Sequence, residues 1–171
     1  MLLYKITSAL LEYPDHELKS ALLEITTLLD SQTISAEERS TLKRFMQWLD
    51  AQDVTELQAA YVTTFDMNPE HSLHLTHHLF GDDRGRGPAL IDLSEYYREY
   101  GLEADAKELP DYLPLVLEFA STLEEIEAKV FLGQTVKVLT QLAANLETAE
   151  SPYAPLVRMI EKRGQLAPIS A

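Results

Sequence analysis

Apolar side chains recur every three to four residues along almost the whole chain, and this spacing predicts successive α-helices that each bury one face. No segment shows the sustained alternation of apolar and polar residues that is typical of a β-strand. The chain has 6 glycines among its 171 residues, which are too few for a turn-rich all-β protein. The pattern therefore predicts an all-α fold, a single irregular helical bundle of about eight or nine helices.

Capping residues and glycines mark several of the helix ends. A capping-box pattern opens one helix at residues 35–38 and is repeated at residues 53–56. Pro88 suits the first turn of a later helix, and Gly101 suits the C-terminal end of that helix. Residues 71–80, which lie between these elements, are expected to form a short helix.

The chain shows no composition shift or flexible stretch that would separate two domains. We therefore expect one all-helical domain over residues 1–165, followed by a frayed tail over residues 166–171. A helix from about Tyr112 is apolar on nearly every side, so it is expected to lie at the centre of the bundle. A long helical region over residues 123–147 follows it, with a break expected near Gly133.

The acidic balance of the chain limits the partners that it can have. Its 28 acidic and 14 basic residues give a net charge of −14, and residues 51–130 carry 17 acidic and 5 basic side chains. Nucleic acid is not expected as a partner, because binding to phosphates requires clustered lysines and arginines. The acidic middle instead favours a basic partner such as an arginine-rich peptide, although surplus carboxylates also keep proteins soluble.

The chain contains no cysteine, which excludes disulfides and any zinc ion or iron–sulfur cluster held by its own thiolates. No apolar run is long enough for a signal peptide or for a membrane-spanning helix. We therefore expect a cytoplasmic protein that does not insert directly into a membrane.

Four of the five histidines are crowded together, at positions 71, 74, 77 and 78. On a helix, His74 and His78 would lie one turn apart, a spacing at which two imidazoles can hold a metal. The HExxH pattern of metalloproteases is absent, because Leu75 follows His74. Alternatively, these histidines cap helices, bond to neighbouring helices or line a groove. A metal-binding helical protein is therefore one alternative function.

A glycine-rich loop, GDDRGRG at residues 81–87, superficially resembles a phosphate-binding loop. It lacks the residue order of a P-loop, and no strand precedes it. Arg84 and Arg86 can each form bidentate pairs with carboxylates, and Asp92 and Glu118 are among the candidate partners. We interpret both arginines as bracing the loop against neighbouring helices, with contact to a partner protein as the alternative.

Two helices carry carboxylates beside apolar and aromatic residues. Asp92 and Tyr96 share one face of the helix after Pro88, whereas Glu118 and Thr122 share one side of the apolar helix that follows. Because a lone buried charge is costly, each carboxylate should face solvent, an internal arginine or a cation of a ligand. Such faces can take an amphipathic peptide that bears lysine or arginine. No nucleophile stands in a recognisable catalytic setting, so an interaction protein is favoured over an enzyme.

Six ordered sequence blocks resemble those of a known family. They are LLEYP at residues 10–14, YVTTFD at 61–66, LHLTHH at 73–78, GDDRGRG at 81–87, ELPDYLPL at 108–115 and SPYA at 151–154. Together they resemble the NarJ-type nitrate reductase assembly chaperones, which are related to the TorD/DmsD group. The resemblance implies an all-helical, cytoplasmic chaperone dedicated to the catalytic subunit of respiratory nitrate reductase.

The resemblance also implies a mode of action. Such a chaperone binds the immature subunit, including its leader-like N-terminal peptide, and supports insertion of the molybdenum cofactor and an iron–sulfur cluster before the subunit docks on the membrane. It is not an enzyme and carries no cofactor or metal of its own, and we expect a monomer. A chaperone for another molybdoenzyme, of the dimethyl sulfoxide reductase kind, is the alternative, but the ELPDYLPL block favours the nitrate reductase branch.

The blocks that carry the resemblance and the two carboxylate-bearing helices supply the candidate residues for a peptide-binding groove. They either line the groove or support it: Tyr61, Phe65, Asp66, His74, His78, Asp92, Tyr96, Glu118 and Thr122. The proposed mechanism is binding without chemistry, in which apolar side chains of the peptide are buried and its cations meet carboxylates.

Overall fold

A computed structural model describes residues 1–103 and 107–165. Over these two ranges the chain forms ten α-helices and no strand beyond one isolated bridge, so the all-α prediction is confirmed. The helices are α1 (Leu2–Leu11), α2 (His16–Asp30), α3 (Ala36–Ala51), α4 (Val54–Tyr61), α5 (Leu75–Phe80), α6 (Arg86–Glu99), α7 (Leu113–Thr122), α8 (Glu125–Gly133), α9 (Val136–Thr148) and α10 (Ala154–Gln165). The tail predicted over residues 166–171 lies outside the described residues. None of the helices in the described ranges is long and apolar enough to cross a membrane.

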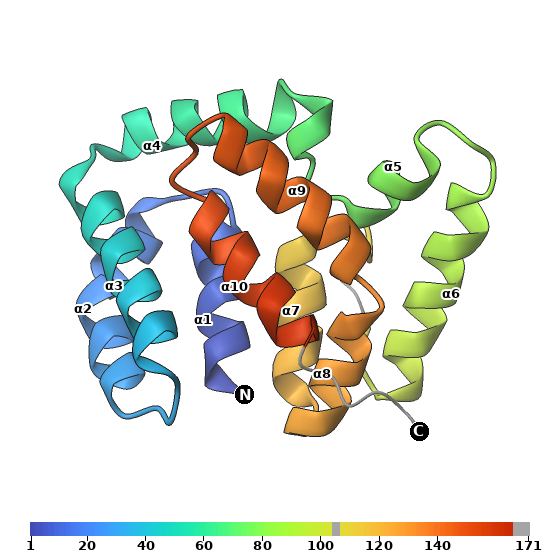
Figure 1. Cartoon of the computed structure of the whole chain (residues 1–171), viewed down its shortest axis with the longest axis horizontal. Coiled ribbons are helices and arrows are strands. Elements are labelled where there is room, and N and C mark those ends of the chain that lie inside the picture. Colours follow the sequence, from blue (N-terminus) through green and yellow to red (C-terminus); the bar gives the residue numbers. More distant parts are fainter. Residues whose placement is uncertain (104–106, 166–171) are drawn as a thin grey trace.

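The helices form an irregular bundle with three regions (Figure 1). The antiparallel pair α2 and α3 forms one end of the molecule, and α5 with α6 forms the opposite end. Between them lie α1, α7, α8, α9 and α10, with α10 packed against α3, α8 and α9. A π-helical turn (Val62–Asp66) continues α4, and a short 3-10 turn (Pro69–His71) follows it.

Two helices, α7 and α10, lie in the centre of the bundle, and α7 is the helix that the sequence predicted there. Helix α7 packs along α1, and its residues Leu113 and Leu117 have no exposed surface. Helix α10 buries Leu156 and Ile160 completely. It also comes very close to α8, because a Cβ atom on Gly164 would lie 3.0 Å from the carbonyl oxygen of Leu132. Glycine is therefore required where α10 crosses this neighbour.

Most predicted helix ends are confirmed. In the capping box of α3, the Glu38 amide donates to Ser35 Oγ at 3.1 Å and the Ser35 amide donates to Glu38 Oε2 at 2.9 Å. Gly101 has φ +77°, and it ends α6 because a residue without Cβ adopts this conformation at low cost. The region over residues 123–147 is broken after Gly133 into α8 and α9, which raises the helix number above the predicted eight or nine.

Two local predictions are wrong. Asp53 caps α4 by accepting a hydrogen bond from the Thr55 amide at 2.8 Å, but among the described residues the Glu56 carboxylate accepts no bond from the Asp53 amide, so the second capping box is incomplete. Residues 71–80 are not one helix. The backbone at His74 instead forms an antiparallel bridge with Tyr112, and α5 begins only after it. This pairing with a distant segment satisfies backbone groups that a helix would otherwise have used.

Candidate functional site

An acidic groove lies where the end of α1 meets the segment before α7. Its volume is about 380 Å³. Its lining residues are Glu12, Tyr13, Lys107, Glu108, Tyr112, Leu115 and Glu118, and we refer to this set as the acidic groove. Three carboxylates and one lysine thus surround two tyrosine rings and a leucine. The groove therefore offers an apolar surface and a negative charge to the same ligand.

The carboxylates of the groove influence one another. The pKa of the Glu12 carboxyl is held above its usual range, first because burial removes part of its hydration. The negative charges of Glu118, Asp15 and Glu108 raise this pKa further. A cation of a ligand would relieve this repulsion, so the groove is better suited to a positively charged group than to a neutral one.

Tyr112 lines the groove, and Tyr61 lies behind it. The Tyr61 hydroxyl donates to the Leu11 carbonyl oxygen at 2.8 Å, and it lies 2.8 Å from the Tyr112 hydroxyl. Because the carbonyl can only accept, Tyr112 is the donor to Tyr61. Burial raises the pKa of the Tyr112 hydroxyl to about 12, and the charge of Asp66 is among the smaller contributions. Tyr61 is buried and therefore supports the groove without lining it.

His74 covers the other face of Tyr112. The two rings stack with centroids 5.2 Å apart, and His74 Nε2 lies 3.7 Å from Glu108 Oε2. This position results from the backbone bridge between His74 and Tyr112, which joins segments that are far apart in the sequence. His74 therefore supports the groove and can offset part of its negative charge when protonated.

Two other histidines of the cluster, His71 and His78, contact backbone carbonyls. His71 Nδ1 lies 3.0 Å from the Thr64 oxygen, and His78 Nε2 lies 2.7 Å from the Ser72 oxygen. Each of these ring nitrogens must donate, because a carbonyl oxygen only accepts. Burial lowers the pKa of His78, so it favours the neutral ring. Over residues 1–103 and 107–165, no three histidines, aspartates or glutamates are grouped as a metal site would require.

Arg86 contacts residues outside its loop that the sequence did not single out. Its Nε donates to Thr76 Oγ1 at 2.9 Å, and its Nη2 lies 3.9 Å from Asp111 Oδ2. Neither Asp92 nor Glu118 forms an ion pair with an arginine among the described residues. Arg84 is exposed in the same loop.

The other candidate residues lie away from the acidic groove. Tyr96 stacks on Phe131 with centroids 5.7 Å apart and helps to hold α6 against the bundle. Asp92 is exposed on α6, and Thr122 donates its hydroxyl hydrogen to the Phe119 carbonyl at the end of α7. Phe65 is buried in an aromatic cluster with Tyr61 and others. Asp66 is exposed where the chain leaves α4.

Comparison with known proteins places the chain in a family. The sequence model of the nitrate reductase delta subunit family matches residues 31–158. The chain belongs to the nitrate reductase delta subunit family. The resemblance deduced from the sequence blocks is thereby confirmed.

Three curated relatives illustrate the delta subunit family. The chain is 36% identical over 163 residues to the nitrate reductase molybdenum cofactor assembly chaperone NarJ of Escherichia coli K12, covering 95% of this chain and 69% of that protein. It is 32% identical to a probable chaperone of the same name from Bacillus subtilis 168, covering 92% and 85%. It is 33% identical to the probable assembly chaperone NarW of Escherichia coli K12, covering 91% and 65%.

Sequence reasoning identified only part of the groove of this delta subunit family member. Among the predicted residues, Glu118 lines the groove, and Tyr61 and His74 support it. Glu12 and Glu108 were missed as lining residues, although both lie in blocks that carry the family resemblance. The sequence does not show that these two blocks are neighbours in the folded protein, and without that information they could not be assigned to one surface.

Proposed function

We propose that this protein is a cytoplasmic chaperone for the catalytic subunit of a respiratory nitrate reductase. The support comes from its family and from relatives named as nitrate reductase molybdenum cofactor assembly chaperones. These relatives are named for assembly and not for catalysis, in agreement with the expectation of a protein that is not an enzyme. We further propose that it acts as a monomer, and that it keeps its client competent for insertion of the molybdenum cofactor and an iron–sulfur cluster.

We infer that the acidic groove holds the leader-like N-terminal peptide of the client. The observation that carries this proposal is the grouping of Glu12, Glu108 and Glu118 around one accessible hollow. The pKa of Glu12 is raised by burial first and by the neighbouring carboxylates second, in agreement with this grouping. Cations of the peptide would meet Glu12, Glu108 and Glu118, while its apolar side chains would pack on Tyr112 and Leu115. The affinity should fall as salt is added, because the carboxylates are close to solvent. No bond is made or broken in this step.

Calorimetric titration with a peptide of the catalytic subunit's N-terminus tests the proposal. The Glu118→Gln variant removes one groove charge with little change of shape, and Glu56→Gln removes an exposed charge on α4 as the matched control. An exposed ion pair contributes up to about 1 kcal/mol, so Glu118→Gln should weaken binding roughly fivefold at low salt. The control should leave the affinity unchanged.

Two outcomes would remove this proposal. Absence of saturable binding by the folded wild-type protein would exclude the peptide as a ligand. Equal affinities for the wild type and for a variant with Glu12, Glu108 and Glu118 all changed to glutamine would exclude the groove as its site. A scrambled peptide of the same composition separates sequence recognition from attraction between net charges.

Comparing the affinities of leader peptides from two molybdoenzymes tests which enzyme is the client. A leader peptide from a molybdoenzyme of the dimethyl sulfoxide reductase kind should bind more weakly than the nitrate reductase peptide, because all three relatives are named for nitrate reductase. Stronger binding of the other leader would reassign the client and keep the chaperone class.

A further inference from the structure

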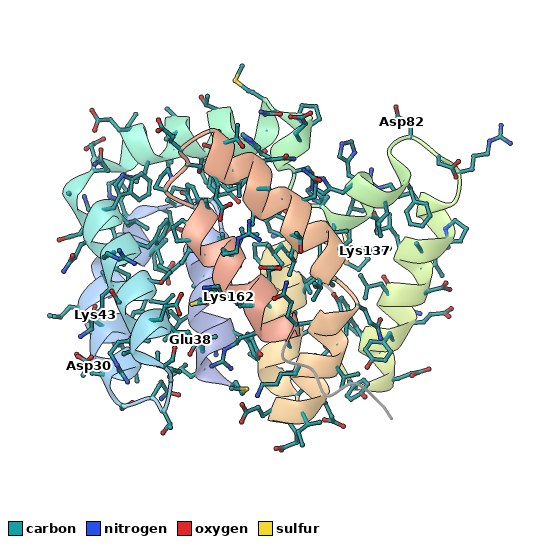
Figure 2. The ribbon with its side chains drawn as sticks, viewed as in Figure 1. Asp30, Glu38, Lys43, Asp82, Lys137 and Lys162 are labelled. Atoms are coloured by element: carbon teal, nitrogen blue, oxygen red, sulfur yellow. The ribbon has the colours of Figure 1, made fainter. Side chains whose placement is uncertain are left out.

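A second hollow is lined by residues of α6 and its neighbours. Helix α6 lies at the end of the molecule opposite to α2 and α3 (Figure 1). We call this hollow the α6 pocket, and its volume is about 200 Å³. Residues of α5 to α9 line it, among them Leu79, Ala89, Leu93, Phe131 and Val138. Figure 2 shows Asp82 pointing away from the body of the protein at the nearby α5–α6 turn. The pocket is thus an apolar hollow at the edge of an acidic protein.

The size and rim of the α6 pocket suit a single large apolar side chain. An apolar cavity of about 150 Å³ can hold a benzene-sized molecule, and the α6 pocket is somewhat larger. Leu79, which belongs to its lining, is 62% exposed. An apolar rim of this kind is open to a partner, whereas an internal packing defect would be closed.

The wall of the α6 pocket also contains an unpartnered carboxylate oxygen. Asp111 is 1% exposed, and its Oδ2 accepts from the amide and the hydroxyl of Thr76 at 2.9 and 2.6 Å. Its buried Oδ1 accepts no hydrogen bond from any described residue. A buried acceptor without a donor is unfavourable, so a ligand that supplies a donor would gain from the contact.

The α6 pocket is distinct from the acidic groove, because one chain segment separates them. Tyr112 and Leu115 of this segment line the groove, whereas Asp111 and Val116 line the pocket. The backbone bridge at His74 fixes the segment in place between the two hollows. A ligand in the pocket therefore contacts different side chains from a ligand in the groove.

We propose that the α6 pocket is a second docking site, which takes one large apolar side chain of the client together with an adjacent cation or hydrogen-bond donor. The apolar side chain fills the space above Phe131 and Leu93, and the donor reaches Asp111. Asp111 supplies the negative charge in the lining of the pocket and would attract a donor or cation of the client. Arg86 Nη2 lies 3.9 Å from the other oxygen, Oδ2. This proposal rests on the proposed function in one respect, since it takes the client to be the catalytic subunit of nitrate reductase.

The test measures binding of the purified catalytic subunit, prepared without its molybdenum cofactor, to four folded variants of the chaperone. Ala89→Phe fills the pocket, Ala89→Ser leaves it open, and Leu79→Asp makes its exposed rim polar. Ala59→Phe adds the same ring at an exposed position on α4. Thermal unfolding establishes that each variant is folded. Titration with the client's N-terminal peptide is run in parallel.

The filled and polar-rim variants are expected to bind the catalytic subunit roughly tenfold more weakly or worse, whereas Ala89→Ser and Ala59→Phe should bind as the wild type does. Wild-type affinity of both Ala89→Phe and Leu79→Asp would overturn the α6 pocket as a docking site. A wild-type protein that binds neither the subunit nor the peptide would instead refute the proposed function. The two failures are therefore distinguishable.

Discussion

The close approach of α10 to α8 and α9 makes a quantitative prediction for Gly164→Ala. A Cβ at this position would lie 2.7 Å from Val136 Cγ2 and 3.0 Å from the Leu132 carbonyl oxygen. Alanine in a helix normally gains about 0.5–1 kcal/mol over glycine, whereas overpacking a core costs about 1–3 kcal/mol. The clash includes a backbone atom, which cannot rotate away, so we expect a net loss of about 1–2 kcal/mol.

Urea unfolding followed by circular dichroism measures this loss, and the matched control is Gly87→Ala. Nothing lies within 4 Å of a Cβ at Gly87, in the first turn of α6. The control should therefore be neutral or up to about 1 kcal/mol more stable than the wild type. If Gly164→Ala were as stable as Gly87→Ala, α10 could not lie as close to α8 as the structure has it. Only the substitution at Gly164 is expected to lower the stability, although glycine is replaced by alanine in both variants.

Three further substitutions test the site and the helix ends. Tyr61→Phe should lower the free energy of unfolding by about 1–2 kcal/mol in urea, because the Tyr112 hydroxyl and a buried carbonyl lose their partner; an unchanged value would contradict this network. The raised pKa of Glu12 means that the folded state binds its proton more tightly than the unfolded state, so the wild type loses stability as pH rises through that pKa. Glu12→Gln should therefore have a higher Tm at neutral pH, and the gap should close in acid; a gap independent of pH would contradict the raised pKa of Glu12. Gly101→Ala should cost about 1–2 kcal/mol, because φ is +77° there, and a neutral result would show another backbone conformation.

Local signals predicted the helix ends that depend only on neighbouring residues. The Ser35 capping box and the end of α6 at Gly101 are such cases, since each involves side chains or dihedral angles within one turn. The same reasoning failed at His74, where the chain pairs with Tyr112 across a large sequence separation. Hydrogen bonding to this distant segment was favoured over a helix at His74, and the residues next to His74 do not indicate such a contact.

Of the residues that line the acidic groove, the sequence reasoning had named only Glu118 as a candidate. Glu118 was identified because a carboxylate on an apolar helix must be paired or face solvent, since burying an unpaired charge is costly. Glu12 gave no such signal, since it follows a short helix and looks like an ordinary surface residue. Only the packing of α1 along α7 brings its carboxylate into the same hollow as Glu118. For Arg86, bracing was predicted, but its partner Asp111 was identified only from the structure.

The sequence by itself determined an acidic, all-helical protein of the nitrate reductase delta subunit family, because periodicity, capping residues and ordered motif blocks are properties of short segments. The tertiary structure decided which of these segments meet. The acidic groove joins Glu12 to Glu118, and the α6 pocket joins Leu79 to Phe131. Their shape and charge arise from helices packed together across the bundle, and contacts of this kind leave no trace in the spacing of residues along the chain.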